Sequence, residues 1–290
     1  KDQVKEAALI NDDLKGSKII ATKKLPQFDA EEWTLENGAK VVFRKADYEK
    51  DQVQVSSYSK GGTSLYGIDK LASAQVTDQF IGAYGLGDYD AITLRKLLTG
   101  KQAQAGVSIG GLSESVGGAS TPNDFETLMQ LIYLRFEKPR FDKEVHNTMM
   151  QRNYAAIENS ANNPQKIMQD SVSMIMSNYS PRTLLFGKEF LDKVSIEQIE
   201  EIYRDRIKDI SDFTFFIVGN IDAETVKPLV EKYLGSVKSY NRKENWVDNK
   251  VRGPKGRTEK VIELDLTRSE EHTSELQSHH DLVCRLLLEK

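Results

Sequence analysis

The chain contains one motif with the composition of a hydrolase active site. Gly106-Val-Ser-Ile-Gly110 matches the Gly-x-Ser-x-Gly nucleophile elbow, whose serine attacks a carbonyl carbon. That chemistry needs a strand, a sharp turn and then a helix, with a histidine later in the chain to accept the serine proton. Here the motif lies in a strand-like run that turns into another one, and His146 is the one candidate base before residue 268. A serine hydrolase using Ser108 is therefore the weakest of the three functional hypotheses, and the other two follow at the end of this section.

His146 offers little for metal chemistry. It lies on an expected helix close to Glu144, without the further nitrogen or sulfur donors that a transition metal would need. We predict a partly exposed helix residue that binds no metal.

Three glycine-rich stretches could suggest ligand-binding loops, but each has a simpler interpretation. Gly82-Ala-Tyr-Gly-Leu-Gly87 lacks the glycine order and the preceding strand of a dinucleotide loop, so we expect a chain reversal between helices. Gly61-Gly62-Thr63-Ser64 lacks the lysine of a P-loop and predicts a tight turn. Gly117-Gly118 predicts a bulge or a close backbone approach within a strand. If that strand is an edge, it could accept a peptide as an added strand.

The end of the chain has a different origin. Residues Arg268 to Ser278 are identified as the peptide that a common DNA-sequencing adapter encodes in one reading frame. We therefore expect the natural chain to end near Leu266 and leave residues 268–290, a non-native tail, out of fold reasoning. The tail contains the chain's one cysteine and three of its four histidines, namely Cys284, His272, His279 and His280.

Composition predicts a globular protein. The 290 residues are 39% hydrophobic and 29% charged, which suits a packed core and about two domains. The tail holds 3 of the 40 basic and 5 of the 44 acidic residues, leaving 37 and 39, so no nucleic-acid surface is indicated. No run approaches the ~20 apolar residues of a membrane helix. The chain begins at Lys1 without a leader pattern, which favours a start within a longer protein.

The strongest structural pattern runs from Asp212 to Gly235. Phe213 to Val218 is almost continuously apolar, which predicts a strand covered on both faces. Apolar residues at helical spacing follow, so we expect a helix that lies on the sheet and ends at Gly235. Pro228 should then lie in the first turn of a helix capped by Thr225, or kink the helix.

The other elements alternate between strands and groups of helices. Asn37-Gly38 between two strand-like runs predicts a hairpin with a type I′ turn. Ser195-Ile-Glu-Gln198 is a capping box that opens a helix. The expected order is ββ-αα-ββ-αααα-β-α, which is typical of the α+β class: a mostly antiparallel β-sheet packed against several helices.

Four stretches, taken in order, carry a family resemblance. They are Leu35-Glu-Asn-Gly-Ala-Lys-Val-Val42, Lys60-Gly-Gly-Thr-Ser64, the Pro139 to Pro164 helix, and Phe215-Phe-Ile-Val-Gly-Asn220 with the helix after it. The sequence resembles the M16 metallopeptidases, the family of pitrilysin, insulin-degrading enzyme and the mitochondrial processing peptidase. The resemblance implies an M16-type metallohydrolase unit, of the kind that clamps face to face with others around a closed chamber.

The resemblance also implies what this unit lacks. The first unit of such peptidases carries His-x-x-Glu-His, in which two imidazoles one helical turn apart bind zinc and a carboxylate activates water. The corresponding helix here, Ala72 to Phe80, has no histidine and one carboxylate, Asp78, although Glu158 could sit near the third-ligand position. We expect no catalytic and no metal-binding residue in this chain, with zinc in the parent protein; the substrate-binding residues stay unknown. The likeness is strongest to the third unit of long bacterial members.

The expected domain layout follows from the same resemblance. Residues 1–30 form a connector, 31–240 the inactive M16-like unit, 241–258 a linker, and 259–267 the start of a following unit, before the tail at 268–290.

Two hypotheses rank above hydrolysis at Ser108. The first is a non-catalytic, chamber-forming part of a zinc metalloendopeptidase, whose partners are an N-terminal catalytic half, in the same or a separate chain, and peptide substrates. The second is a free-standing inactive relative that acts as a scaffold or assembly partner. Because long bacterial relatives are usually exported, the resemblance favours the periplasm or the cell envelope.

Overall fold

The computed structural model describes residues 8–160, 163–265, 275–277 and 282–289. The chain divides into two compact units. The first comprises Lys1–Asn147 and Val194–Val247, and the second comprises Thr148–Lys193 and Asp248–Lys290.

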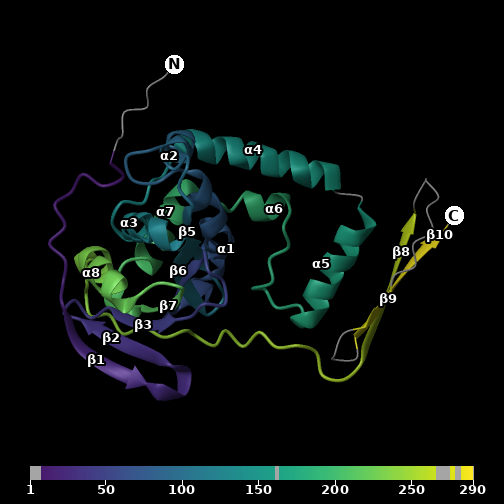
Figure 1. The fold of residues 1–290 in the computed structure, drawn as a ribbon. Coiled ribbons are helices and arrows are strands. Elements are labelled where there is room, and N and C mark those ends of the chain that lie inside the picture. The colour runs from purple at the N-terminus through teal and green to yellow at the C-terminus, as the bar shows by residue number, and fades with distance from the viewer. Residues whose placement is uncertain (1–7, 161–162, 266–274, 278–281, 290) are drawn as a thin grey trace. The chain divides into compact units, whose positions relative to one another are not determined.

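A seven-stranded sheet of order β1-β2-β3-β7-β4-β6-β5 forms the framework of the first unit (Figure 1). Its strands are Ile19–Leu25 (β1), Ala30–Leu35 (β2), Lys40–Lys45 (β3), Val53–Lys60 (β4), Ala103–Ile109 (β5), Ser113–Ser120 (β6) and Thr214–Gly219 (β7). β3 and β7 are parallel, and the other neighbouring pairs are antiparallel. The predicted α+β class with a mostly antiparallel sheet is confirmed.

Helices pack against one face of this sheet. α1 and α3 contact β5, α3 also contacts β6 and α8, and α1 contacts α7 (Figure 1). The helices that lie wholly in the first unit are Ile68–Ala83 (α1), Ala91–Leu97 (α2), Phe125–Glu137 (α3), Ile196–Arg206 (α7) and Ala223–Tyr233 (α8). Short 3-10 turns lie at Pro26–Phe28, Gly62–Leu65, Pro122–Asp124, Ile210–Asp212 and Leu234–Ser236. The core forms where these helices meet the inward residues of the strands, such as Val41, Val53 and Phe215, all 0% exposed.

The central strand β7 is covered on one face, not on two as predicted. Phe215 and Ile217 are fully buried, whereas Phe216 and Val218, on the opposite face, are 39% and 37% exposed. Neighbouring β4 shows the same alternation, because Gln54 and the other even-numbered residues are exposed. The prediction failed because a run of apolar residues shows only that the side chains are apolar. It does not show whether another element packs on both faces of the strand.

The β2–β3 hairpin is present, but its turn differs from the predicted type. Gly38 has a φ of +87°, while Asn37 is not among the non-glycine residues with positive φ, so a type I′ turn is excluded. Leu35 N–H donates to the Ala39 carbonyl, which closes a three-residue loop with glycine in the left-handed position.

Helix α8 begins earlier than predicted. Asp222, not Thr225, is its N-cap residue, so Pro228 lies inside the helix and outside its first turn. Glu224 therefore loses the intrahelical partner that an N–H at position 228 would supply.

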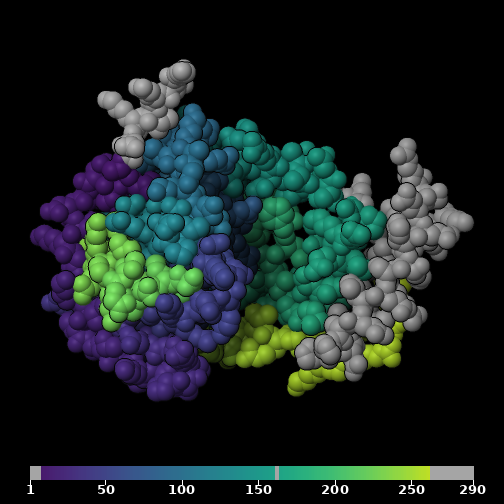
Figure 2. All heavy atoms as spheres, viewed as in Figure 1, coloured from purple at the N-terminus to yellow at the C-terminus, as the bar shows by residue number. Residues whose placement is uncertain are grey.

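Part of the predicted connector packs along α8. Ser17 N–H donates to the Glu231 carbonyl at 3.0 Å, and the Ser17 hydroxyl donates to the Gly235 carbonyl at 2.7 Å. Figure 2 shows this N-terminal segment in purple beside α8 in green. The chain then forms β1, which pairs with β2 as an edge strand, so residues 19–25 belong to the sheet. The boundaries of the predicted domains remain predictions.

The second unit contains α5 (Pro164–Met176), α6 (Lys188–Leu191) and a three-stranded sheet of order β8-β10-β9. α4 (Lys143–Ser160) begins in the residues of the first unit and ends in those of the second. The strands are Thr258–Asp265 (β8), Glu275–Gln277 (β9) and Leu282–Glu289 (β10). Because β9 and β10 lie in the predicted non-native tail, we give this sheet no functional weight. No helix among the described residues is long and apolar enough to cross a membrane.

Candidate functional site

Helix α1 is where the resemblance would place zinc ligands. Its residues Leu71 to Ala74 are buried, and the helix contains no histidine. The Asp78 carboxylate accepts hydrogen bonds from the backbone N–H groups of Gln79 at 2.8 Å and Ile109 at 3.4 Å. This single carboxylate does not fit zinc, which proteins bind through three or four imidazole, thiolate or carboxylate ligands.

A metal site is also not assembled elsewhere in the described part of the chain. There, no group of three or more His, Cys, Asp or Glu side chains could hold a metal ion. Glu158, considered for the third-ligand position, lies exposed on α4. Whether the chain binds zinc stays a prediction for a metal assay.

His146 is buried, which corrects the prediction of a partly exposed residue. It is 6% exposed, its Nδ1 lies 2.8 Å from the Tyr84 hydroxyl, and its ring centroid is 5.1 Å from that of Phe80. Burial lowers the pKa of His146, so the neutral imidazole is favoured. The ring is a core residue whose polar nitrogen is satisfied by a tyrosine.

The Gly-x-Ser-x-Gly motif lies in the wrong structural context for a nucleophile elbow. Ser108 is on β5, an edge strand that turns into β6, and it pairs with Ser115 across the antiparallel ladder. No helix follows the serine, so the sharp strand-to-helix turn that exposes a nucleophile is absent at this position.

The glycine pair Gly117-Gly118 marks a close backbone approach, as predicted, and no edge. β6 lies between β4 and β5, so it cannot accept a further strand. A Cβ atom on Gly117 would overlap the Val55 carbonyl oxygen, and one on Gly118 the Gln104 carbonyl oxygen. The Ser57 hydroxyl bonds both N–H and C=O of Val116, at 2.8 and 2.7 Å.

Two other glycine stretches are turns, as predicted. Gly85 and Gly87 have φ of +91° and +59° where the chain reverses between α1 and α2. Gly62, with a φ of +56°, starts a 3-10 turn whose Thr63 N–H donates to the Gly110 carbonyl. Neither loop has the geometry of a phosphate-binding site.

The most unusual chemistry of the first unit is a buried pair of opposite charges. Glu114 on β6 and Arg206 at the end of α7 are each 1% exposed, with Oε1 and Nη1 3.6 Å apart. Gly62 N–H and the Ser59 hydroxyl donate to the Glu114 carboxylate at 2.6 and 3.0 Å. Burial raises the pKa of Glu114 to about 7, against the lowering effect of these donors and of Arg206.

Arg206 links this pair to three further groups. Its Nε donates to the Tyr66 hydroxyl at 3.0 Å, while Nη2 donates to Asp205 at 2.7 Å and to Glu244 at 3.0 Å. Burial alone would lower the pKa of Arg206, but these partners raise it overall. Gly61 is required beside it, because a Cβ atom there would overlap the guanidinium. The Lys60-Gly-Gly-Thr-Ser64 motif thus serves to fit this arginine.

The same cluster fixes the start of the predicted linker. Buried Asp209 accepts the backbone N–H groups of Tyr240 at 3.0 Å and Arg242 at 2.6 Å, and the Arg242 guanidinium donates to Asp212 at 2.6 Å. The geometry stabilises a structure and offers no open position for a substrate.

Sequence reasoning missed this cluster, although periodicity contains a signal for it. Glu114 shares strand parity with buried Val116, and Arg206 lies seven residues after Ile199, on the buried stripe of α7. A charged residue on a predicted core face is the signal that would have identified both.

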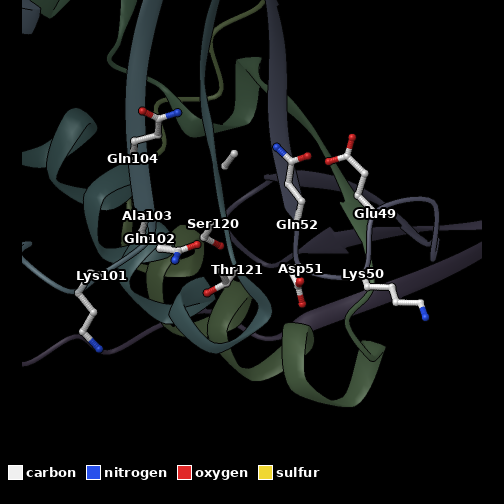
Figure 3. A pocket seen from close by; sticks show the side chains of 11 residues that line it. Glu49, Lys50, Asp51, Gln52, Lys101, Gln102, Ala103, Gln104, Ser120 and Thr121 are labelled. Atoms are coloured by element: carbon white, nitrogen blue, oxygen red, sulfur yellow. The ribbon is translucent and has the colours of Figure 1, made fainter.

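A polar pocket of about 630 Å³ is the candidate ligand site of the first unit. It opens where β4 and β5 begin and β6 ends, and its lining includes the loop at residues 49–52 (Figure 3).

Comparison with known proteins finds a family match for part of the chain and distant relatives for most of it. Residues 193–278 match the family model described as the peptidase M16 inactive domain. The chain is 21% identical over 234 residues to the probable zinc protease PqqL of Haemophilus influenzae, covering 78% of this chain and 24% of the relative. It is 25% identical over 215 residues to the zinc protease PQQL-like of Arabidopsis thaliana, covering 73% and 20%. The chain thus spans about a quarter of the curated relatives.

Solved structures show the same fold. The periplasmic protease PqqL of Escherichia coli superposes with a TM-score of 0.73 at 17% identity, over 89% of this chain and 28% of that one. A peptidase M16 inactive domain from Pseudomonas fluorescens gives a TM-score of 0.61 at 16% identity, over 82% and 57%. Residues 193–278 thus resemble the inactive domain of the M16 peptidases, and the chain is similar to proteins named zinc proteases and shares the fold of solved M16 structures.

Proposed function

We propose that the chain is a non-catalytic unit of an M16 zinc metalloendopeptidase. It forms part of the wall of a peptide-enclosing chamber, and the zinc site lies on the N-terminal half of the parent protein. The observation that carries the proposal is α1, which keeps its packing on β5 and α7 while carrying no imidazole. A unit that keeps the M16 fold but lacks zinc ligands is better suited to forming the chamber wall than to carrying the active site.

Two further observations support a role within a larger peptidase. The relatives named zinc proteases are about four to five times as long as their match to this chain, which leaves room for a catalytic half. The uncovered sheet face mixes polar and apolar side chains, because Gln54, Ser56 and Gln104 are exposed alongside Tyr58, Phe216 and Val218. Exposed apolar residues rimmed by polar ones are typical of an interaction surface, which a chamber wall would need.

The test separates metal binding from peptide cleavage. The chain is incubated with zinc, dialysed and analysed by mass spectrometry, and a quenched fluorescent peptide is supplied with and without the catalytic half that carries His-x-x-Glu-His. We expect substoichiometric zinc and no cleavage from the chain alone, and faster cleavage when the chain is added to the catalytic half. Ser108→Ala should leave that cleavage unchanged, since Ser108 is not a nucleophile.

Stoichiometric zinc or cleavage by the chain alone would refute the proposal. So would an upstream reading frame without His-x-x-Glu-His. A start codon and export signal directly before Lys1 would favour the scaffold hypothesis instead. Because the Escherichia coli relative is described as periplasmic, we also place the parent protein in the periplasm or cell envelope, which fractionation of expressing cells can test.

A further inference from the structure

The uncovered face of the sheet carries nine side chains in register, which we call the β3-β7-β4 grid. β7 pairs with β3 on one side and with β4 on the other, and residues directly opposite one another share a face. Phe216 lies at the centre of the grid. Its three rows are Lys40, Thr214 and Tyr58; Val42, Phe216 and Ser56; and Arg44, Val218 and Gln54.

Four apolar side chains form a contiguous patch in this grid. Tyr58, Phe216 and Val218 are 45%, 39% and 37% exposed, and Val42, opposite Phe216, is partly buried. Single exposed apolar residues are common on proteins, but neighbours that are exposed together mark an interaction surface. Four partly exposed side chains offer far less than the roughly 800 Å² per partner that a stable interface between folded proteins buries. The patch therefore suits a short ligand better than a folded partner.

Two cations flank the patch, and the grid contains no carboxylate. Lys40 and Arg44 lie at its two corners on β3 and form no salt bridge within the described part of the chain. The Arg44 Nη2 donates to the Tyr48 hydroxyl at 2.9 Å, a neutral partner that leaves the positive charge uncompensated. Glu32, next to the grid on β2, is opposite Lys23 on β1. The charges of the grid therefore favour an anionic ligand.

The spacing of these groups matches that of an extended peptide. Lys40, Val42 and Arg44 are alternate residues of one strand, so their side chains point to the same face roughly 6.4–6.8 Å apart. Alternate side chains of any extended chain have the same repeat. A peptide laid along β3 can therefore place an acidic, an apolar and a second acidic side chain over these three residues in turn.

We propose that the β3-β7-β4 grid binds extended peptide segments with the pattern acidic-x-apolar-x-acidic. The apolar side chain packs on Val42 and Phe216, and the two carboxylates lie against Lys40 and Arg44. The inference rests on the proposed function, because a chamber wall is where an unfolded peptide would meet this face. It adds to that function the class of peptide that the wall retains.

Fluorescence anisotropy of the intact 290-residue chain tests the pattern. Two labelled, blocked heptapeptides share one composition of two glycines, two serines, two aspartates and a central phenylalanine. In the first peptide the aspartates are two positions from the phenylalanine, and in the second they are adjacent to it, which turns them to the opposite face of an extended chain. We expect the first to bind at least about fivefold more tightly at low salt, with the difference shrinking as salt screens the charges.

Variants of the two cations test the electrostatic part of the site. Lys40→Gln/Arg44→Gln should abolish the difference between the two isomeric peptides. The matched control is Lys243→Gln/Lys255→Gln, which removes two exposed cations of the predicted linker and should leave the difference unchanged. Because both variants lose the same net charge, only the position of the cations distinguishes them.

A variant of the central aromatic residue tests the apolar part. Phe216→Gln should weaken binding of the first peptide roughly fivefold, because the phenylalanine of the peptide loses its aromatic contact. Phe28→Gln, which removes a ring that is 62% exposed outside the grid, should bind both peptides as the unmodified chain does. Melting curves confirm that each variant is folded.

Four results would overturn the proposal. They are equal binding of the two isomers, an unchanged difference in Lys40→Gln/Arg44→Gln, unchanged affinity in Phe216→Gln, and sedimentation in which the unmodified chain dimerises and Phe216→Gln does not. The last would assign the grid to a second copy of this chain. The anisotropy assay measures binding by this chain alone. A failure of the chamber role would appear in the cleavage assay and leave this binding result unaffected, so the two proposals fail separately.

Discussion

Replacing Arg206 by methionine tests whether the buried charge cluster holds the first unit together. Methionine keeps the length of the arginine stem but removes the charge that faces Glu114, Asp205 and Glu244. Removing one partner of a buried ion pair typically costs about 3–5 kcal/mol, because the remaining charge stays buried without compensation. Since Arg206 is 1% exposed, solvent cannot take over its role, and we expect a loss of that size at pH 8.

The loss should be smaller at pH 5.5. The pKa of Glu114 is already raised to about 7, so in the variant this carboxyl can take up a proton and shed its buried charge. Asp205 does not share this property, because its pKa is lowered despite burial and the variant keeps the Tyr66 hydrogen bond that contributes to this lowering. Part of the penalty therefore persists at both pH values.

Urea unfolding followed by tryptophan fluorescence measures the effect, because Trp33 is fully buried in the first unit. The control is Arg204→Gln, two residues earlier on the same helix. Arg204 is 53% exposed and pairs with Glu200 at 2.7 Å, so its loss should cost about 1 kcal/mol or less. A loss in Arg206→Met that does not exceed the control would refute the reasoning.

Three other substitutions test single features of the sheet. Glu114→Gln removes a group whose folded pKa of about 7 exceeds its unfolded value near 4.5. Between these two pH values folding takes up a proton, so the wild-type free energy of unfolding falls as pH rises, by about 3 kcal/mol at most. Urea titrations at pH 5 and 7.5 measure this fall, and the free energy of unfolding of the variant should change less between the two pH values. Ser57→Ala leaves the N–H and C=O of Val116 unpaired and should cost about 1–3 kcal/mol in urea unfolding; a neutral result would mean that the strands repair the gap. Gly118→Ala should lower the melting temperature because its Cβ overlaps the neighbouring strand, whereas Gly106→Ala on β5, with open space around the Cβ, should change it little, and equal shifts would contradict the packing argument.

Elements specified by local sequence were predictable. The apolar periodicity of Phe213 to Val218 and of the helix after it gave β7 and α8. The one-turn helix α6, at Lys188–Leu191, was missed, because four residues are too few to show a helical period. Local pattern therefore sets which long elements form and leaves short ones undetermined.

Contacts between distant segments also complete the ends of helices, so local sequence gives only part of a cap. At the Ser195 capping box, the Ser195 hydroxyl accepts the Gln198 N–H at 3.2 Å, as predicted. The reciprocal bond is replaced, because the Ser73 hydroxyl accepts the Ser195 N–H and donates to the Gln198 side chain. A residue on α1 thus completes the cap of α7, and no local pattern could have indicated it.

The candidate site was less predictable than the fold, for the same physical reason. Its pocket forms where three segments meet, and the pairing of Ser120 with both Val53 and Ala103 depends on strand order. The two residues that suggested chemistry have structural roles instead. Ser108 lies in the β5–β6 ladder, and His146 is a buried residue bonded to Tyr84. Residue type alone pointed to positions where no site forms, because the fold decides which side chains come close to one another.

The error at β7 could have been avoided by comparing strands that lie side by side. Ser56 pairs with Phe216 and Gln54 with Val218, so these residues share one face of the sheet. The alternation in β4 already predicts that its even-numbered face is open to solvent. Neighbouring residues on one face share one environment, so the polar row of β4 should have outweighed the apolar run of β7. Applying that argument requires knowing that β4 and β7 are neighbours, which is a property of the sheet order and of no single stretch of sequence.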